Sequence, residues 1–153
     1  MKKMTPKFKR LYLSGLMTDK ATGEVSDVNI EAFIKAFHYI RQNTPYRIVN
    51  PTNVWMCRYP WMYRLLRRLV GSEWAYRLVL LYDLILLMRS DYIYKIPGWQ
   101  QSRGANIESC VAYHLKIYQM PSKIKDPIDK KIAKMREKYE HKTTSDDGIQ
   151  QSQ

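Results

Sequence analysis

The stretch DYIYKIPGWQQSRGANIE, residues 91–108, contains the pattern that decides the fold. Its residues Tyr92–Ile96 are mostly aromatic or aliphatic and a proline–glycine pair follows them, which predicts a short buried strand ended by a turn. The segment Ser102–Leu115 then predicts a helix with a glycine in its first turn. A buried strand, a polar turn and a helix in this order are typical of a parallel α/β sheet.

The same order occurs earlier in the chain. Lys9–Ser14 predicts a first strand, and Tyr46–Val49 predicts a second one that ends at an asparagine–proline pair. Between them, apolar residues recur at helical spacing from Ile30 to Ile40, so we expect an amphipathic helix there. Lys116–Gln119 predicts a fourth strand. This alternation favours right-handed parallel connections and an α/β domain of three layers.

Three segments lie outside this alternation. Residues 53–77 are rich in Trp, Tyr and Arg and predict a helical insertion, in which Gly71 separates two helices and Ser72 caps the second. Pro121–Pro127 predicts a linker before a charged helix, and the polar residues from Lys142 predict disorder. We therefore expect an α/β domain at 1–120, a C-terminal charged helix at 121–141 and a disordered tail at 142–153.

The composition excludes several classes of protein. The chain has 153 residues, with 26 Lys and Arg against 14 Asp and Glu and a formal net charge of +12. Its two cysteines are too few for a disulfide scaffold or a four-thiolate zinc site, and with three histidines they show no metal-ligand spacing, so we expect no metal. Neither a P-loop nor a GxGxxG motif occurs, so we expect no cofactor. The positive charge admits phosphorylated small molecules, nucleic acid or a membrane surface as partners.

The apolar runs in the sequence are short. The longest, Leu78–Met88, is interrupted by Asp83 and falls short of the roughly 20 residues that a membrane span needs. The basic N-terminus is not followed by the apolar core of a signal peptide. We therefore expect a cytoplasmic protein without a membrane span.

Polar and small residues after the predicted strands form the candidate site, because ligands of an open parallel sheet bind beyond the carboxyl ends of its strands. These residues are Ser14, Gly15, Asn50, Pro51, Gly98, Trp99, Ser102, Arg103 and Gly104. The amide groups at the start of the helix from Ser102 suit a phosphate or carboxylate, and Arg103 would add a charged donor. Trp99 either stacks on a base or packs over the loop or against a neighbouring subunit.

Glu108 lies further along the same predicted helix, where its carboxylate would face the strand ends. A carboxylate in this place can attack the C1′ atom of a sugar, after which water or a second base resolves the glycosyl intermediate. The alternative is a solvated glutamate, which is what most helical glutamates are. Spacing alone leaves both interpretations open.

Several motifs, taken in order, resemble those of a known family. They are YLSG at Tyr12–Gly15, MTD at Met17–Asp19, NxxAF at Asn29–Phe33, VNP at Val49–Pro51, SDYIYKIPGW at Ser90–Trp99 and SRGANIE at Ser102–Glu108. From Leu11 to Tyr118 the sequence resembles small bacterial and phage proteins related to the nucleoside 2-deoxyribosyltransferases. The resemblance implies a flavodoxin/Rossmann-like three-layer sandwich. It also implies cleavage or exchange of the N-glycosidic bond of a nucleoside or nucleoside 5′-monophosphate.

The resemblance assigns roles to individual residues. It implies that Glu108 is the nucleophile, that Asp91 helps place or protonate the leaving base, and that Tyr12 contacts the nucleophile or the sugar. Ser102 stands where the transferases that use free nucleosides usually carry an aspartate, so the resemblance favours a nucleoside monophosphate. It also implies a homo-oligomer.

Other interpretations stay open at this stage. Asp91 would instead cap the turn before the third strand, and Asp83 is either a polar-face residue or a carboxylate of the cleft. The insertion at 53–77 is a lid, a dimer surface, a surface for single-stranded nucleic acid or a packed pair of helices. Three functions stay open for the chain: an enzyme that acts on N-glycosidic bonds, a non-catalytic nucleotide-binding or sensor module, and a basic accessory protein that binds nucleic acid.

Overall fold

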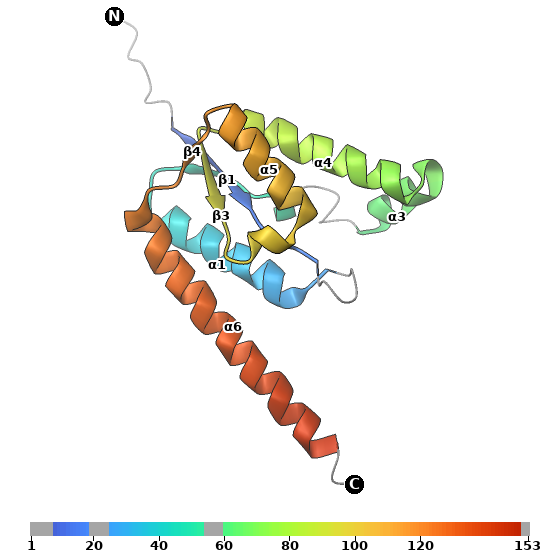
Figure 1. Ribbon diagram of the computed structural model, residues 1–153, viewed down its shortest axis with the longest axis vertical. Coiled ribbons are helices and arrows are strands. Elements are labelled where there is room, and N and C mark those ends of the chain that lie inside the picture. Colours follow the sequence, from blue (N-terminus) through green and yellow to red (C-terminus); the bar gives the residue numbers. More distant parts are fainter. Residues whose placement is uncertain (1–7, 19–24, 54–59, 151–153) are drawn as a thin grey trace, which may run out of the picture.

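The computed structural model of the chain describes residues 8–18, 25–53 and 60–150, and within them the strands form one parallel sheet (Figure 1). The strands are β1 (Arg10–Ser14), β2 (Arg47–Val49), β3 (Tyr92–Lys95) and β4 (Tyr118–Gln119). Their order across the sheet is β2-β1-β3-β4, which confirms the predicted three-layer, flavodoxin/Rossmann-like α/β fold. The order reverses between β1 and β3, which is where an open parallel sheet binds its ligands.

Helices cover both faces of the sheet (Figure 1). The helices are α1 (Asp27–Asn43), α3 (Pro60–Val70), α4 (Ser72–Met88), α5 (Arg103–His114) and α6 (Ser122–Gln150), with short 3-10 turns η1 (Pro51–Asn53) and η2 (Trp99–Gln101). α1 and α6 pack on one face, and α4 and α5 pack on the other. α3 packs against α4, and the α3–α4 pair projects to one side of the sheet in Figure 1.

The alternation of side chains along β1 decides what each layer contains. Leu11 and Leu13 are fully buried among residues of α1 and α6, whereas Tyr12 packs on the opposite face against α4 and α5. Ser14 follows Tyr12 by two positions and therefore lies on the same face. One face of the central strand is thus aliphatic, and the other presents two hydroxyl groups at its carboxyl end.

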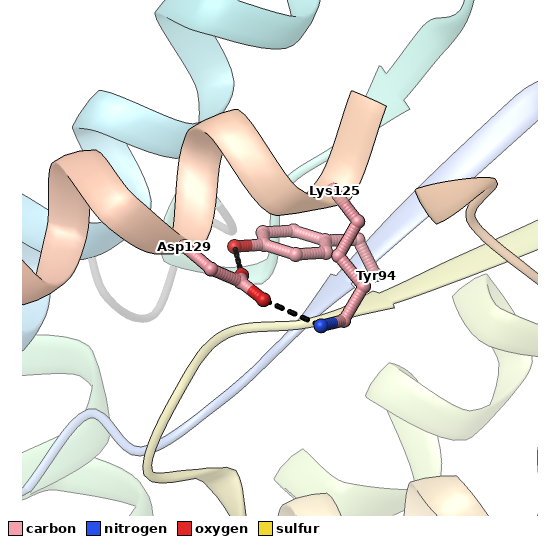
Figure 2. Close-up of polar contacts among 3 residues, drawn as sticks. All are labelled: Tyr94, Lys125 and Asp129. Atoms are coloured by element: carbon pink, nitrogen blue, oxygen red, sulfur yellow. Dashed lines mark hydrogen bonds and ion pairs between the residues drawn. The ribbon is translucent and has the colours of Figure 1, made fainter. Parts of the chain in front are cut away.

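A partly buried polar contact joins α6 to β3 (Figure 2). The hydroxyl of Tyr94, a fully buried residue, donates a hydrogen bond of 2.7 Å to Asp129 of α6. The same carboxylate forms an ion pair with Lys125, one turn earlier in α6. Asp129 is therefore paired on both oxygens, which is the condition under which a carboxylate can be placed between a helix and a sheet.

The linker predicted at Pro121–Pro127 is wrong, because α6 already begins at Ser122 and contains Pro127. An internal proline costs a helix about 3 kcal/mol. Ile128 and Ile132 are buried against the sheet, and burying two such side chains contributes about 3–6 kcal/mol, enough to offset that cost. The helix also continues to Gln150, through residues for which the sequence predicts disorder.

The predicted division of the insertion is confirmed, with one change at its boundary. Gly71 separates α3 from α4 and is itself the N-cap residue, with a φ of 84°, so Ser72 is the first helical residue and not the cap. The insertion residues 54–59, with Trp55, lie outside the described residues. Among the helices that are described, none is long and apolar enough to cross a membrane.

Replacing Tyr94 with phenylalanine tests the contact between β3 and α6. Tyr94→Phe removes one hydrogen bond to the Asp129 carboxylate and should lower the free energy of unfolding by about 1–3 kcal/mol. Tyr118→Phe, at a residue that is 70% exposed, is the matched control and should change stability little. Urea denaturation measures both variants, and equal stability of the two would contradict a supporting role for this contact.

Candidate functional site

The candidate site lies on the α4–α5 face of the sheet, at the carboxyl end of β1. The Tyr12 hydroxyl donates a hydrogen bond of 2.8 Å to Oε1 of Glu108, and the Ser14 hydroxyl donates one of 2.5 Å to Oε2. The Glu108 side chain is only 6% exposed. Each carboxylate oxygen is thus held by one hydroxyl group, which fixes the position of the carboxylate at the switch point between β1 and β3.

Local sequence explains why α5 directs Glu108 inward. Ser102 is the N-cap of the helix, and its side-chain oxygen accepts a hydrogen bond from the Ala105 amide. The buried residues of α5 are Ala105, Glu108 and Ala112, which lie on one helical face. Glu108 therefore occupies a core position between two alanines, whose small side chains let the helix approach the sheet closely. A solvated helical glutamate, the alternative left open by the sequence, is excluded by this burial.

Burial and hydrogen bonding act in opposite directions on Glu108. Burial raises the pKa of the Glu108 carboxyl above its usual range because it disfavours the charged form. The hydrogen bonds from Ser14 and Tyr12 favour the charged form and offset part of this increase. The group is thus a carboxylate whose negative charge is kept from water and held by directed donors.

A second carboxyl group on this side of the sheet, that of Asp83 in α4, is also buried. Asp83 is 9% exposed, and no hydrogen-bond donor or cation pairs with it among the described residues. Its pKa is raised to about 7, first by burial and then by the negative charge of Glu108. Two hydroxyl groups hold Glu108, whereas Asp83 has no such donor among the described residues, so the two buried carboxyl groups lie in different environments.

A tyrosine and an arginine complete the α4–α5 side of the site. The Tyr76 hydroxyl is buried and has no hydrogen-bond partner among the described residues. Its pKa is raised, mainly by burial, while the nearby Arg103 lowers it and Glu108 raises it. The guanidinium of Arg103 lies 5.5 Å from the centre of the Tyr76 ring. A Cβ atom on Gly104 would be 3.7 Å from the Tyr76 oxygen, so packing does not require glycine there.

Other residues expected at the strand ends have contacts of their own. The Asn50 side-chain oxygen accepts hydrogen bonds from the amide and hydroxyl of Thr52, and Pro51 beside it is buried. The Lys95 ammonium lies 4.3 Å from the centre of the Trp99 ring. A Cβ atom on Gly15 would lie 3.0 Å from that of Ile96, so a larger residue here would fit only if its neighbours moved slightly.

Arg136 of α6 fastens the loop after β3. Its guanidinium donates hydrogen bonds to the carbonyl oxygen of Pro97 at 2.7 Å and to the side-chain oxygen of Asn29 at 3.3 Å. Gly98 adopts a φ of 88°, and a Cβ atom there would lie 2.9 Å from Nη1 of Arg136. Gly98 therefore gives the loop both a left-handed turn and room for the arginine.

The structure does not bring Asp91 to this site. Asp91 precedes β3, at the amino end of the strands, and its carboxylate accepts a hydrogen bond of 2.7 Å from the Arg10 amide. Glu108 contacts β1 at its carboxyl end, through Tyr12 and Ser14. The contact of Asp91 corresponds to the structural alternative for this residue, and the catalytic expectation lacks support because the two carboxylates belong to opposite ends of the sheet.

Asp83 and Tyr76 are the residues that sequence reasoning placed least well. The sequence alone leaves two interpretations of Asp83, a polar-face residue or a carboxylate of the cleft. No sequence pattern singles out Tyr76. The available signal was Asp83 itself, the only charged residue in Leu78–Met88. A lone charge within an apolar helix is either solvated or buried, and the burial of Asp83 makes it a candidate for the site.

A groove of about 660 Å³ lies elsewhere, between α1 and α6. Its lining includes Lys35, Lys131, Lys134 and Lys138, and an aromatic ring, that of Tyr39. These helices pack on the face of the sheet opposite to Glu108. The groove is therefore separate from the paired carboxylates.

Fold and site together define a parallel α/β domain with a buried glutamate at its topological switch point and a buried aspartate on the neighbouring helix α4. The chain belongs to the family described as a domain of unknown function, DUF4406, whose model matches residues 9–120. No curated protein and no solved structure matches the chain. The matched range ends just before α6, so the helix that contributes Asp129 and Arg136 lies outside it.

Asp83 should make the stability of the protein depend on pH. An ordinary aspartate titrates near 3.8 and folded Asp83 near 7, so folding favours the protonated form. The contribution of Asp83 to the free energy of unfolding should therefore be most favourable below pH 4. It should fall by up to about 4 kcal/mol between pH 4 and 7. Denaturation of Asp83→Asn at pH 5 and pH 8 should show a smaller decrease than in the wild type.

The matched control for this measurement is Asp126→Asn, at an exposed position of α6. It should retain the wild-type decrease between the two pH values. An Asp83→Asn variant with the wild-type decrease would show that this carboxyl group does not titrate in the neutral range.

Proposed function

We propose that the protein cleaves or exchanges the N-glycosidic bond of a nucleoside or nucleoside 5′-monophosphate, with Glu108 as the nucleophile. The observation that carries the proposal is the pairing of Glu108, buried and hydrogen-bonded to Tyr12 and Ser14, with the buried carboxyl group of Asp83. The resemblance to the nucleoside 2-deoxyribosyltransferase-like proteins implies the same chemistry. Two carboxyl groups with separated roles are what glycosidic bond cleavage by a covalent route needs.

In the first step an oxygen of Glu108 forms a bond to C1′ of the sugar while the bond from C1′ to the base nitrogen breaks. The hydrogen bonds from Tyr12 and Ser14 orient the carboxylate, and each of its oxygens keeps a further lone pair for the attack. Burial leaves the nucleophile without a water shell that the substrate would have to displace.

Asp83 replaces Asp91 as the proposed proton donor. With a pKa of about 7, a large fraction of Asp83 is protonated at neutral pH and can transfer its proton to the departing base. The resulting Asp83 carboxylate can then accept a proton from water, or from an incoming base, that attacks C1′ and releases Glu108. Protons and bonds balance over the two steps, and the enzyme returns to its starting state.

The start of α5 supports a phosphate on the substrate. The amides of Arg103 and Gly104 lie in the first helical turn, where no carbonyl four residues earlier in the helix can accept from them. Arg103 is exposed and carries its charge beside Tyr76. Ser102 caps the helix with its hydroxyl oxygen, so we assign the proposed phosphate to these amides and to Arg103.

The direct test is release of free base, measured by chromatography, from a panel of deoxynucleosides and deoxynucleoside monophosphates. Glu108→Gln removes the nucleophilic charge and should lower the rate by at least about 10³-fold. Glu137→Gln, at an exposed residue of α6, is the matched control and should keep the wild-type rate. Folded wild-type protein that releases and exchanges no base would contradict the enzyme proposal, and nucleotide binding without turnover would favour the binding module.

The pH profile of the rate tests the two carboxyl roles. Glu108 must be ionised and Asp83 protonated, so the rate should be bell-shaped and fall above about pH 7. Asp83→Asn should lower the maximum rate and abolish the decrease above pH 7, with the protein confirmed as folded by circular dichroism. A decrease that survives in Asp83→Asn would assign the proton to another group.

A further inference from the structure

The groove between α1 and α6 carries an excess of positive charge. Four lysines and a histidine are among the residues that line it: Lys35, His38, Lys131, Lys134 and Lys138. Glu31 is the one acidic residue among the described lining residues. Its carboxylate already forms an ion pair of 3.1 Å with Lys35 and accepts a hydrogen bond from the Tyr139 hydroxyl. The lining of the groove therefore leaves most of its lysine charge without an acidic partner.

The lysines that α6 contributes form a row. Lys131, Lys134 and Lys138 are spaced three and four residues apart, so they share one side of the helix. They follow one another at about 4.5 and 6 Å along the helix axis. Lys134 and Lys138 are exposed, and neither forms an ion pair with a described residue. A row of separated cations suits an anion whose charge repeats along a chain better than it suits a single phosphate.

Aromatic rings lie at both ends of this lysine row. The ammonium of Lys131 is 4.6 Å from the centre of the Tyr39 ring, near the end of α1. Tyr139 of α6 contacts Glu31, near the start of α1, and is 39% exposed. The two helices thus run in opposite directions beside each other (Figure 1), and both tyrosines line the same groove as the lysines.

We propose that this groove binds a single-stranded nucleic acid. The lysine row contacts the phosphates, and bases stack on the rings of Tyr39 and Tyr139, which is how grooves for single strands combine charge with aromatic surface. An acidic peptide is a weaker match, because its carboxylates have no use for the two rings. A duplex is also a weaker match, because its bases already stack on one another and are not available to the tyrosines.

The groove is independent of the proposed reaction. It lies on the face of the sheet opposite to Glu108 and apart from the helical insertion, because α1 and α6 pack on one face and α4 and α5 on the other. Occupation of the groove therefore needs neither the paired carboxyl groups nor a bond broken in the ligand.

Fluorescence polarisation of a labelled oligodeoxythymidylate of about 12 nucleotides, added to the full chain, tests the proposal. Log affinity should fall against log salt concentration with a slope of about −2, as expected for three phosphate contacts on a single strand. The double variant Lys134→Glu and Lys138→Glu should bind at least about tenfold more weakly, because two of the three contacts become repulsive.

The matched control is the double variant Lys123→Glu and Lys130→Glu, at exposed positions of the same helix that do not line the groove. Both double variants lower the net charge equally, so the control should keep the wild-type affinity within about threefold. A wild type that does not bind would overturn the proposal. Equal weakening in the two double variants would overturn it as well, because binding would then follow overall charge and not the groove.

Two further measurements separate a nucleic acid from other occupants. Tyr39→Leu should weaken binding at least about fivefold by removing a stacking surface, whereas Tyr39→Phe should keep the wild-type affinity. Poly-glutamate that competes as well as the unlabelled oligonucleotide would assign the groove to an acidic protein segment and overturn the proposal. Glu108→Gln should bind the oligonucleotide like the wild type, so failure of this proposal and failure of the proposed function are distinguishable.

Discussion

The rest of the site depends on the burial of the Glu108 carboxylate against the hydroxyls of Tyr12 and Ser14. A charged group in this place is costly unless directed donors hold it, and the alternation of β1 supplies those donors two residues apart on one face. The same burial acts on its neighbour, because the charge on Glu108 helps to keep Asp83 protonated at neutral pH. Burial of Asp83 itself is the main cause of its raised pKa, and the charge on Glu108 adds to it.

The helices on the two faces of the sheet contribute different kinds of residue. On one face, α1 and α6 enclose an aliphatic core and contribute the contacts of Asp129 and Arg136 to β3 and to the loop after it. On the other face, α4 and α5 contribute Asp83 and Glu108. The loop fastened by Arg136 leads through η2 into α5, so α6 anchors the chain shortly before the helix that carries Glu108.

Sequence patterns predicted the order of elements well because strand and helix periodicities are local properties. They left Glu108 open between a solvated helical residue and a carboxylate of the cleft, because its burial depends on packing between α5 and β1. They did not place Asp83 and Asp91, because spacing along the chain does not tell which end of a strand or which face of a helix will meet a residue from another element. The linker predicted around Pro127 is wrong for a related reason. Proline disfavours a helix interior, but the burial of Ile128 and Ile132, which only the packed structure reveals, outweighs this effect.

Asp129 and Arg136 are seven residues apart on α6, which is close to two helical turns, and both must face the sheet at once. The two contacts therefore fix both the length and the helical rotation of the segment between these residues. Substitutions on its solvent side are free, whereas the insertion of a single residue would rotate one anchor by about 100° away from its partner. The buried residues Ile132 and Met135 lie within this stretch, so its length and its inward-facing residues are constrained together, and only its exposed positions can vary.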